Sequence, residues 1–177
     1  MSTFFNTKRL CRAAIIAALY VALSAIFTPF AFGPFQFRPA EALCILPLLF
    51  PEAIPALFIG CALFNFTSPY ALYDVLIGGA TTLLATFATY LVGSFVKKDL
   101  PKVLLGGLFP ILLNALIIPI IIVFLCGGTE GYASANIAYF SNAGMIFLTQ
   151  TIWIYGLGIP LYYLMKRLKE KGFAFLE

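Results

Sequence analysis

The sequence contains no histidine, and its four cysteines show no paired spacing. Without histidine, a zinc site or a histidine-dependent active site loses its usual ligand or base. Only 10% of the 177 residues are charged, whereas a soluble domain carries roughly a quarter. We therefore expect no metal site, and a surface that does not face water.

Motifs of nucleotide hydrolysis and of common hydrolases are also absent. The chain has no Gly-x-x-x-x-Gly-Lys-Ser/Thr phosphate loop, no Gly-x-Ser-x-Gly and no His-Glu-x-x-His. Its few carboxylates are scattered and form no persuasive catalytic pair. These absences predict a protein that is not an enzyme and that binds no cofactor itself, ATP included.

Apolar residues make up 62% of the chain, and the mean hydropathy is +1.01. Because a membrane-spanning helix needs about 20 apolar residues, we predict one transmembrane domain, residues 1–177, with spans at about 10–31, 38–50, 53–67, 71–96, 103–126 and 142–165. A polar loop is expected at 127–141, with Glu130, Tyr132 and Asn142 in it or at its margin. The segments 38–50 and 53–67 are short, so a re-entrant hairpin combined with four full spans is an alternative.

All but one of the eleven basic residues fall into three clusters, at 8–12, 97–102 and 166–171. Basic residues near span ends are retained in the cytoplasm, so an even number of crossings should separate neighbouring clusters. The predicted fold is therefore an all-α integral membrane bundle of six transmembrane helices, with the N- and C-termini cytoplasmic. Glu52, between the second and third segments, is expected at the inner face in contact with water.

A few polar side chains remain inside the apolar segments or at their ends. They are Arg38, Glu41, Asn65, Asp74, Asn114 and Gln150. Ionisable groups within a membrane are costly and often mark function. In the six-span arrangement these residues gather in the outer half of the membrane, together with the aromatic residues Phe35, Phe37, Tyr73, Tyr139 and Trp153. This combination predicts a small-molecule pocket that opens to the outside.

Each of these polar residues also has a purely structural interpretation. Glu41 suits the first turn of a helix, or it pairs with Arg38 three residues away. Asp74 would be a charge at a helix start that faces headgroups and water. Asn114 and Gln150 would form interhelical hydrogen bonds, each worth about 0.6 kcal/mol.

Alanines recur four residues apart in the first span, as Ala13 and Ala17 in one row and Ala14, Ala18 and Ala22 in another. Spacing of four places the members of a row on one helical face, where small side chains let another helix approach closely. The alanines therefore form either a packing seam inside this protein or a docking face for a separate membrane subunit.

A small six-span protein with such alanine repeats after a basic cluster resembles the substrate-binding S components of energy-coupling factor (ECF) transporters. The run Phe37-Arg38-Pro39-Ala40-Glu41-Ala42-Leu43, followed by segments 46–49 and 53–61, resembles the QueT family in particular. The segment 74–85 extends this resemblance, which covers essentially the whole chain. The Arg-x-x-Glu-Ala-Leu run is its most specific part.

The resemblance implies uptake of a queuosine precursor, meaning a 7-deazaguanine base, queuine or a related nucleoside, bound from outside. It also implies partners, because an S component associates with a transmembrane scaffold subunit and two ATPase subunits that use ATP. The alanine face of the first span would then be the docking surface.

The chemistry of a deazaguanine suggests a role for each candidate residue. Two adjacent N–H donors on its pairing edge suit a carboxylate, for which Glu41 is the first candidate and Asp74 the second. Arg38 would orient Glu41. The remaining candidates would read the ring edges (Asn65, Asn114, Gln150) or stack on the ring (Phe35, Tyr73, Tyr139, Trp153).

Two other functions are open at this point. The chain would be an S component for a different vitamin if its pocket differed, since one fold hosts many sites. A stand-alone carrier driven by an ion gradient would need a protonatable relay across the membrane, but the acidic residues are expected only near the two faces. That distribution argues against the carrier.

Overall fold

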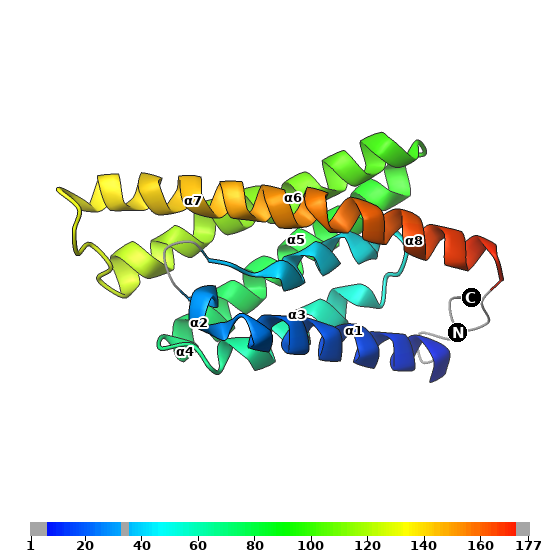
Figure 1. The fold of residues 1–177 in the computed structure, drawn as a ribbon, viewed down its shortest axis with the longest axis horizontal. Coiled ribbons are helices and arrows are strands. Elements are labelled where there is room, and N and C mark those ends of the chain that lie inside the picture. The colour runs from blue at the N-terminus through cyan, green and yellow to red at the C-terminus, as the bar shows by residue number, and fades with distance from the viewer. Residues whose placement is uncertain (1–6, 33–35, 173–177) are drawn as a thin grey trace.

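The computed structural model of the chain describes residues 7–32 and 36–172, and every regular element in these residues is helical (Figure 1). The elements are α1 (Thr7–Ile26), α2 (Thr28–Ala31), η1 (Pro39–Leu48), α3 (Ala53–Asn65), α4 (Ala71–Tyr73), η2 (Asp74–Gly78), α5 (Gly79–Phe95), α6 (Asp99–Ile120), η3 (Ile121–Leu125), α7 (Ala135–Gly156) and α8 (Gly158–Glu170). The predicted all-helical fold is confirmed for this part of the chain.

Within residues 7–32 and 36–172, four helical segments are long and apolar enough to cross a membrane. They are Thr7–Ile26, Ala71–Phe95, Asp99–Leu125 and Ala135–Glu170. The two segments predicted to be short, Pro39–Leu48 and Ala53–Asn65, are shorter apolar helices. In Figure 1 the helices lie side by side along the long axis of the molecule and alternate in direction.

The short segment η1 occupies the centre of the bundle. It packs against α1, α3, α5, α6, α7 and α8, and all ten of its residues are buried. It is a 3₁₀-helix rather than the α-helix that we assumed for residues 38–50. A 3₁₀-helix rises about 2.0 Å per residue, so ten residues extend about 20 Å instead of about 15 Å. The segment therefore reaches farther through the bundle than its length suggests.

Small residues bring the first helices close to the centre. A β-carbon added at Gly60 of α3 would lie 3.1 Å from the carbonyl oxygen of Ala17 and 3.0 Å from the β-carbon of Tyr20. Such distances are tighter than most β-carbon contacts, so glycine here lets α3 approach the α1 backbone without strain. The close contact fixes the position of the Tyr20 side chain, which is completely buried.

Two predicted boundaries are wrong. The polar loop expected at 127–141 is shorter, because α7 already begins at Ala135, where the Ser134 side chain accepts a hydrogen bond from the amide of Ile137. Serine before a helix is a strong N-cap signal, which the hydropathy pattern alone did not use. The first span, expected at 10–31, is interrupted after Ile26, where Phe27 separates α1 from α2 and Pro29 lies in the first turn of α2.

We expected Glu52 to be in contact with water, but its side chain is largely buried. Its carboxylate lies 2.6 Å from the guanidinium of Arg12, and the two side chains are 9% and 6% exposed. The Arg12 guanidinium also lies over the Phe50 ring, 5.1 Å from its centroid. A charge in a poorly hydrated place needs a partner of opposite sign, and this pair ties α1 to the connection between η1 and α3.

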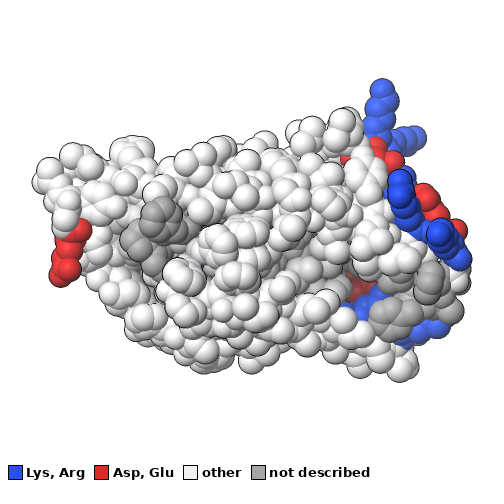
Figure 2. Space-filling view, viewed as in Figure 1, with Lys and Arg blue, Asp and Glu red and all other residues white. Residues whose placement is uncertain are grey.

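The three basic clusters share one end of the bundle. Figure 2 shows Lys and Arg gathered at the end where α8 finishes, with an acidic group alone at the opposite end. At the basic end the Lys166 ammonium bonds to the Asp99 carboxylate at 2.6 Å, and the Tyr162 hydroxyl donates to the same carboxylate at 2.9 Å. These contacts join α8 to the start of α6.

Candidate functional site

Glu41 is the centre of a buried polar cluster that three helices build. The Tyr20 hydroxyl of α1 donates to Glu41 Oε1 at 2.7 Å, and Asn114 Nδ2 of α6 donates to Oε2 at 3.2 Å. The Cys44 thiol, one turn farther along η1, lies 3.4 Å from Oε2. Glu41 is 2% exposed, so these neutral donors take the place of water around its carboxylate.

Arg38 has partners other than Glu41. Its Nε donates to the carbonyl of Ala31 at 3.1 Å, and its guanidinium lies over the rings of Phe32 and Phe64, 5.2 and 6.0 Å from their centroids. The ion pairs among the described residues do not join Arg38 to Glu41, so the suggested pairing of the two is wrong. Arg38 instead holds the end of α2 against α3.

Asn65 and Asp74 meet where α3 turns toward α5. Asn65 Nδ2 donates to the Asp74 carbonyl at 2.7 Å and approaches the Cys61 sulfur at 3.4 Å. The Asp74 carboxylate accepts the hydroxyl of Ser68, and Asp74 is only 8% exposed. The carboxylate is therefore engaged in the turn and does not face water as a helix-start charge would.

Gln150 lies on α7, which packs against α6, the helix that carries Asn114. Gly107 of α6 lies against Ile154 of α7, and Ile118 and Ile146 belong to one core cluster. Gln150 is 3% exposed, and its Oε1 accepts no hydrogen bond from the described residues. The same holds for Asn65 Oδ1. An unsatisfied buried acceptor costs about 1–3 kcal/mol, and a ligand with N–H donors would relieve that cost.

No hydrogen bond joins Glu41 to the aromatic candidates that the structure describes. Trp153 meets Phe37 edge to face, with centroids 4.6 Å apart. The Tyr139 hydroxyl donates to the carbonyl of Leu116 at 3.0 Å. Tyr73 is 39% exposed, and Phe35 lies outside the described residues. The structure thus brings Glu41 and Asn114 together, pairs Asn65 with Asp74, and leaves Trp153, Tyr139 and Tyr73 elsewhere.

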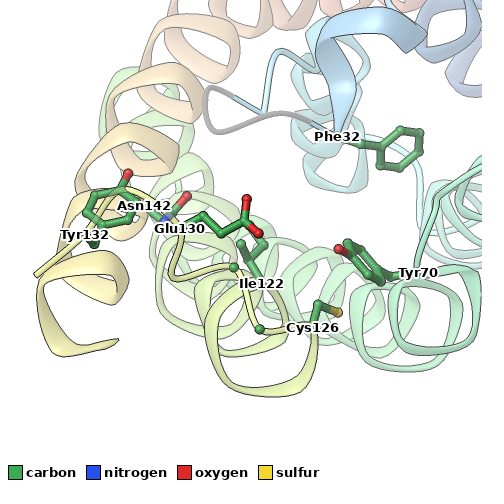
Figure 3. A pocket seen from close by; sticks show the side chains of 9 residues that line it. Phe32, Tyr70, Ile122, Cys126, Glu130, Tyr132 and Asn142 are labelled. Carbon is green, nitrogen blue, oxygen red and sulfur yellow. The ribbon is translucent and has the colours of Figure 1, made fainter. Parts of the chain in front are cut away.

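A hollow of about 360 Å³ opens at the end of the molecule opposite the basic clusters (Figure 3). Its walls include Phe32, Tyr70, Cys126, Glu130, Tyr132 and Asn142. None of the candidate residues that the structure describes lines it. Besides Phe32, Ile122 and Asn142, the lining residues belong to the loop after η3 and to the turn before α4. A signal for the loop was the polar composition of residues 127–132 beside two aromatic side chains.

A second hollow of about 500 Å³ lies between α1 and α3 near the basic end, with Ala13, Ala14 and Ala17 in its wall. The two alanine rows of α1 differ in exposure. Ala13 and Ala17 are half-buried and pack against the core, whereas the row of Ala14, Ala18 and Ala22 is exposed. The first row therefore packs partly against the core and partly lines this hollow, whereas the second row lies on the surface of α1.

Comparisons with known proteins agree with the membrane architecture. A family model described as QueT transporter matches residues 10–167. A protein of Lactococcus lactis subsp. cremoris (strain MG1363), named queuosine precursor transporter QueT, is 38% identical over 90 residues, which are 49% of this chain and 52% of the relative. The chain thus spans about half the length of this curated relative in the match. No solved structure matches.

Proposed function

Because the chain belongs to the QueT transporter family and is a multi-pass protein of the cell membrane, we propose that it is the substrate-binding S component of an ECF importer. Its cargo is a queuosine precursor: a 7-deazaguanine base, queuine or a related nucleoside. The name of the Lactococcus relative supports this cargo. The chain itself carries out no catalysis.

The proposed orientation places the basic end in the cytoplasm, since Lys and Arg near span ends are retained there. The helices then make six crossings, with η1 and α3 as the short ones inside the bundle. Both termini are cytoplasmic, and the hollow beside Glu130 faces outside. Substrate enters from that side and moves toward Glu41.

The observation that carries the proposal is the buried Glu41 carboxylate with its neutral donors. A 7-deazaguanine presents two adjacent N–H donors, which a carboxylate accepts together. Asn114 Nδ2 bonds to Glu41 Oε2, and in the proposed complex this amide donates to the ring carbonyl while the ligand bonds to Glu41. Gln150 Oε1, which lacks a partner among the described residues, accepts a further N–H of the ligand.

Energy comes from partner subunits in this proposal. A transmembrane scaffold docks on the exposed row of Ala14, Ala18 and Ala22, and two ATPase subunits bound to the scaffold hydrolyse ATP. The exposed alanines support this arrangement because small side chains allow a partner helix to pack closely. The salt bridge between Arg12 and Glu52 stiffens α1 next to this face.

The experiment that tests the proposal is a ligand screen on the purified full-length protein. Tritiated 7-deazaguanines and queuine are expected to bind saturably, whereas guanine, riboflavin, thiamine and biotin are expected to compete poorly. Saturable binding of another vitamin, together with no binding of any deazaguanine, would overturn the proposed cargo but keep the importer class.

A further inference from the structure

The hollow at the Glu130 end has the size and the walls of a ligand site. Its volume of about 360 Å³ falls within the range of roughly 300–1,000 Å³ that is usual for small-molecule pockets. Phe32, Tyr70 and Tyr132 contribute aromatic rings to its wall. In Figure 3 the Glu130 side chain extends into the hollow from the loop after η3, and the Tyr70 ring faces it from the other side.

The walls of this hollow are held in place from behind. The Phe32 ring stacks on Phe64, with centroids 5.1 Å apart and the planes 10° from parallel. The amide of Tyr70 donates to Ser68 Oγ at 3.0 Å, and Ser68 in turn bonds to the Asp74 carboxylate. The side chain of Asn142, which is 4% exposed, is fixed by a 2.8 Å hydrogen bond to the carbonyl of Ala138. A site with such support is formed before a ligand arrives.

The described wall of the hollow carries one negative charge and no positive one, because Glu130 is its acidic residue and no lysine or arginine lies there. The loop that carries Glu130 lies at the end of the bundle opposite the end of α8 (Figure 1). Figure 2 shows the basic side chains gathered where α8 finishes. Arg38 is apart from the basic clusters, but its guanidinium lies over Phe32 and Phe64, and its Nε is bonded to Ala31. A carboxylate beside aromatic rings suits a flat ligand that carries a positive group.

We propose that this hollow is the outer recognition site of the protein and that it selects 7-deazaguanines whose 7-substituent carries an amine. Glu130 pairs with the ammonium group, and the rings of Tyr70 and Tyr132 contact the flat bicycle. An alkyl amine is a cation at neutral pH, as lysine is, whereas a nitrile in the same place is neutral and gains nothing from Glu130. The inference rests on the proposed function, since it takes the cargo to be a 7-deazaguanine.

Equilibrium binding of two tritiated probes tests the inference, namely 7-aminomethyl-7-deazaguanine and 7-cyano-7-deazaguanine, on the purified full-length protein. The two probes share the ring and differ in the charge of the substituent. Wild type is expected to bind the amine about tenfold more tightly, the value of one charge-assisted hydrogen bond. Glu130→Gln is expected to abolish this preference while its affinity for the nitrile stays within about twofold of wild type, which also shows that the variant is folded.

A matched control is Glu170→Gln, which removes an exposed carboxylate at the basic end and is expected to keep the tenfold preference. Higher salt should weaken the preference of wild type, because exposed charges are screened. Equal affinity of wild type for the two probes, or an unchanged preference in Glu130→Gln, overturns the inference and leaves the proposed function standing. Failure of wild type to bind either probe overturns both.

Discussion

Glu41 and Glu52 show two ways of keeping a carboxylate in an apolar bundle. Glu52 is paired with Arg12 at 2.6 Å, so the positive charge compensates the negative one. Glu41 has neutral donors, from Tyr20, Asn114 and Cys44, and an ionisable group inside a membrane protein is costly to bury. A group kept at that cost without a counter-charge is a strong candidate for ligand binding.

Glu41→Gln tests this role because the amide has nearly the same shape as the carboxylate. The amide oxygen still accepts from Tyr20, but the second acceptor becomes a donor, so one hydrogen bond to the ligand is lost. We expect the Kd for a 7-deazaguanine to rise at least about tenfold, with little change in thermal stability. Glu170→Gln is the control in the same binding assay, and an unchanged Kd in Glu41→Gln would remove Glu41 from the site.

Two elements position the carboxylate of the site. η1 carries Glu41, and α1 carries Tyr20, which donates a hydrogen bond to it. The ten buried residues of η1 extend about 20 Å through the bundle, which brings Glu41 into contact with helices on several sides. In α1, Tyr20 is buried and the row of Ala13 and Ala17 is half-buried. The outer row, which consists of Ala14, Ala18 and Ala22, is exposed. The same helix thus contacts Glu41 through Tyr20 and exposes the alanine row that we propose for docking.

Ala18→Trp places a large side chain on the outer row and is expected to block close packing of the scaffold helix. When the protein is purified from cells that express the partners, we expect recovery of the ATPase subunits to fall at least about fivefold, while binding of the 7-deazaguanine is unchanged. Leu148→Trp serves as control because Leu148 is 59% exposed on α7, away from α1. Equal recovery with the two variants would contradict docking on the alanine row.

At the scale of the whole molecule, charge is strongly polarised along the bundle. The basic side chains gather at one end (Figure 2), where Lys166 pairs with Asp99, and the loop that carries Glu130 lies at the other end (Figure 1). The body between them is largely apolar and exposes many large hydrophobic side chains, as lipid contact requires. The polarity of the molecule predicts its orientation in the membrane.

Cysteine labelling in intact cells checks that orientation. In a background without the four native cysteines, a membrane-impermeant maleimide is expected to label Glu130→Cys fully and Lys171→Cys hardly at all, because only the first faces outside. Both variants should label after the cells are opened, which shows that both thiols are reactive. Labelling of Lys171→Cys in intact cells would reverse the topology.

Several features of the site were predictable because they depend on single residues. Polar side chains are scarce in the apolar segments, so Glu41, Asp74 and Asn114 were easy to single out. Their burial follows from the apolar residues around them. The positions of Glu130 and Tyr132 in a loop were also expected. That this loop and Tyr70 line one hollow depends on how segments far apart in the sequence pack together, and no local pattern encodes that arrangement.

By itself the sequence determined the membrane environment, the helical class and the gathering of basic charge, since each follows from local composition and from the cost of placing polar groups in lipid. Only the tertiary structure decided that Glu41 meets Asn114, 73 residues away, that Arg38 turns from Glu41 to Ala31, and that Glu52 is paired with Arg12. Partner choice is a property of packed neighbours, and the helices that supply them are brought together only when the bundle closes.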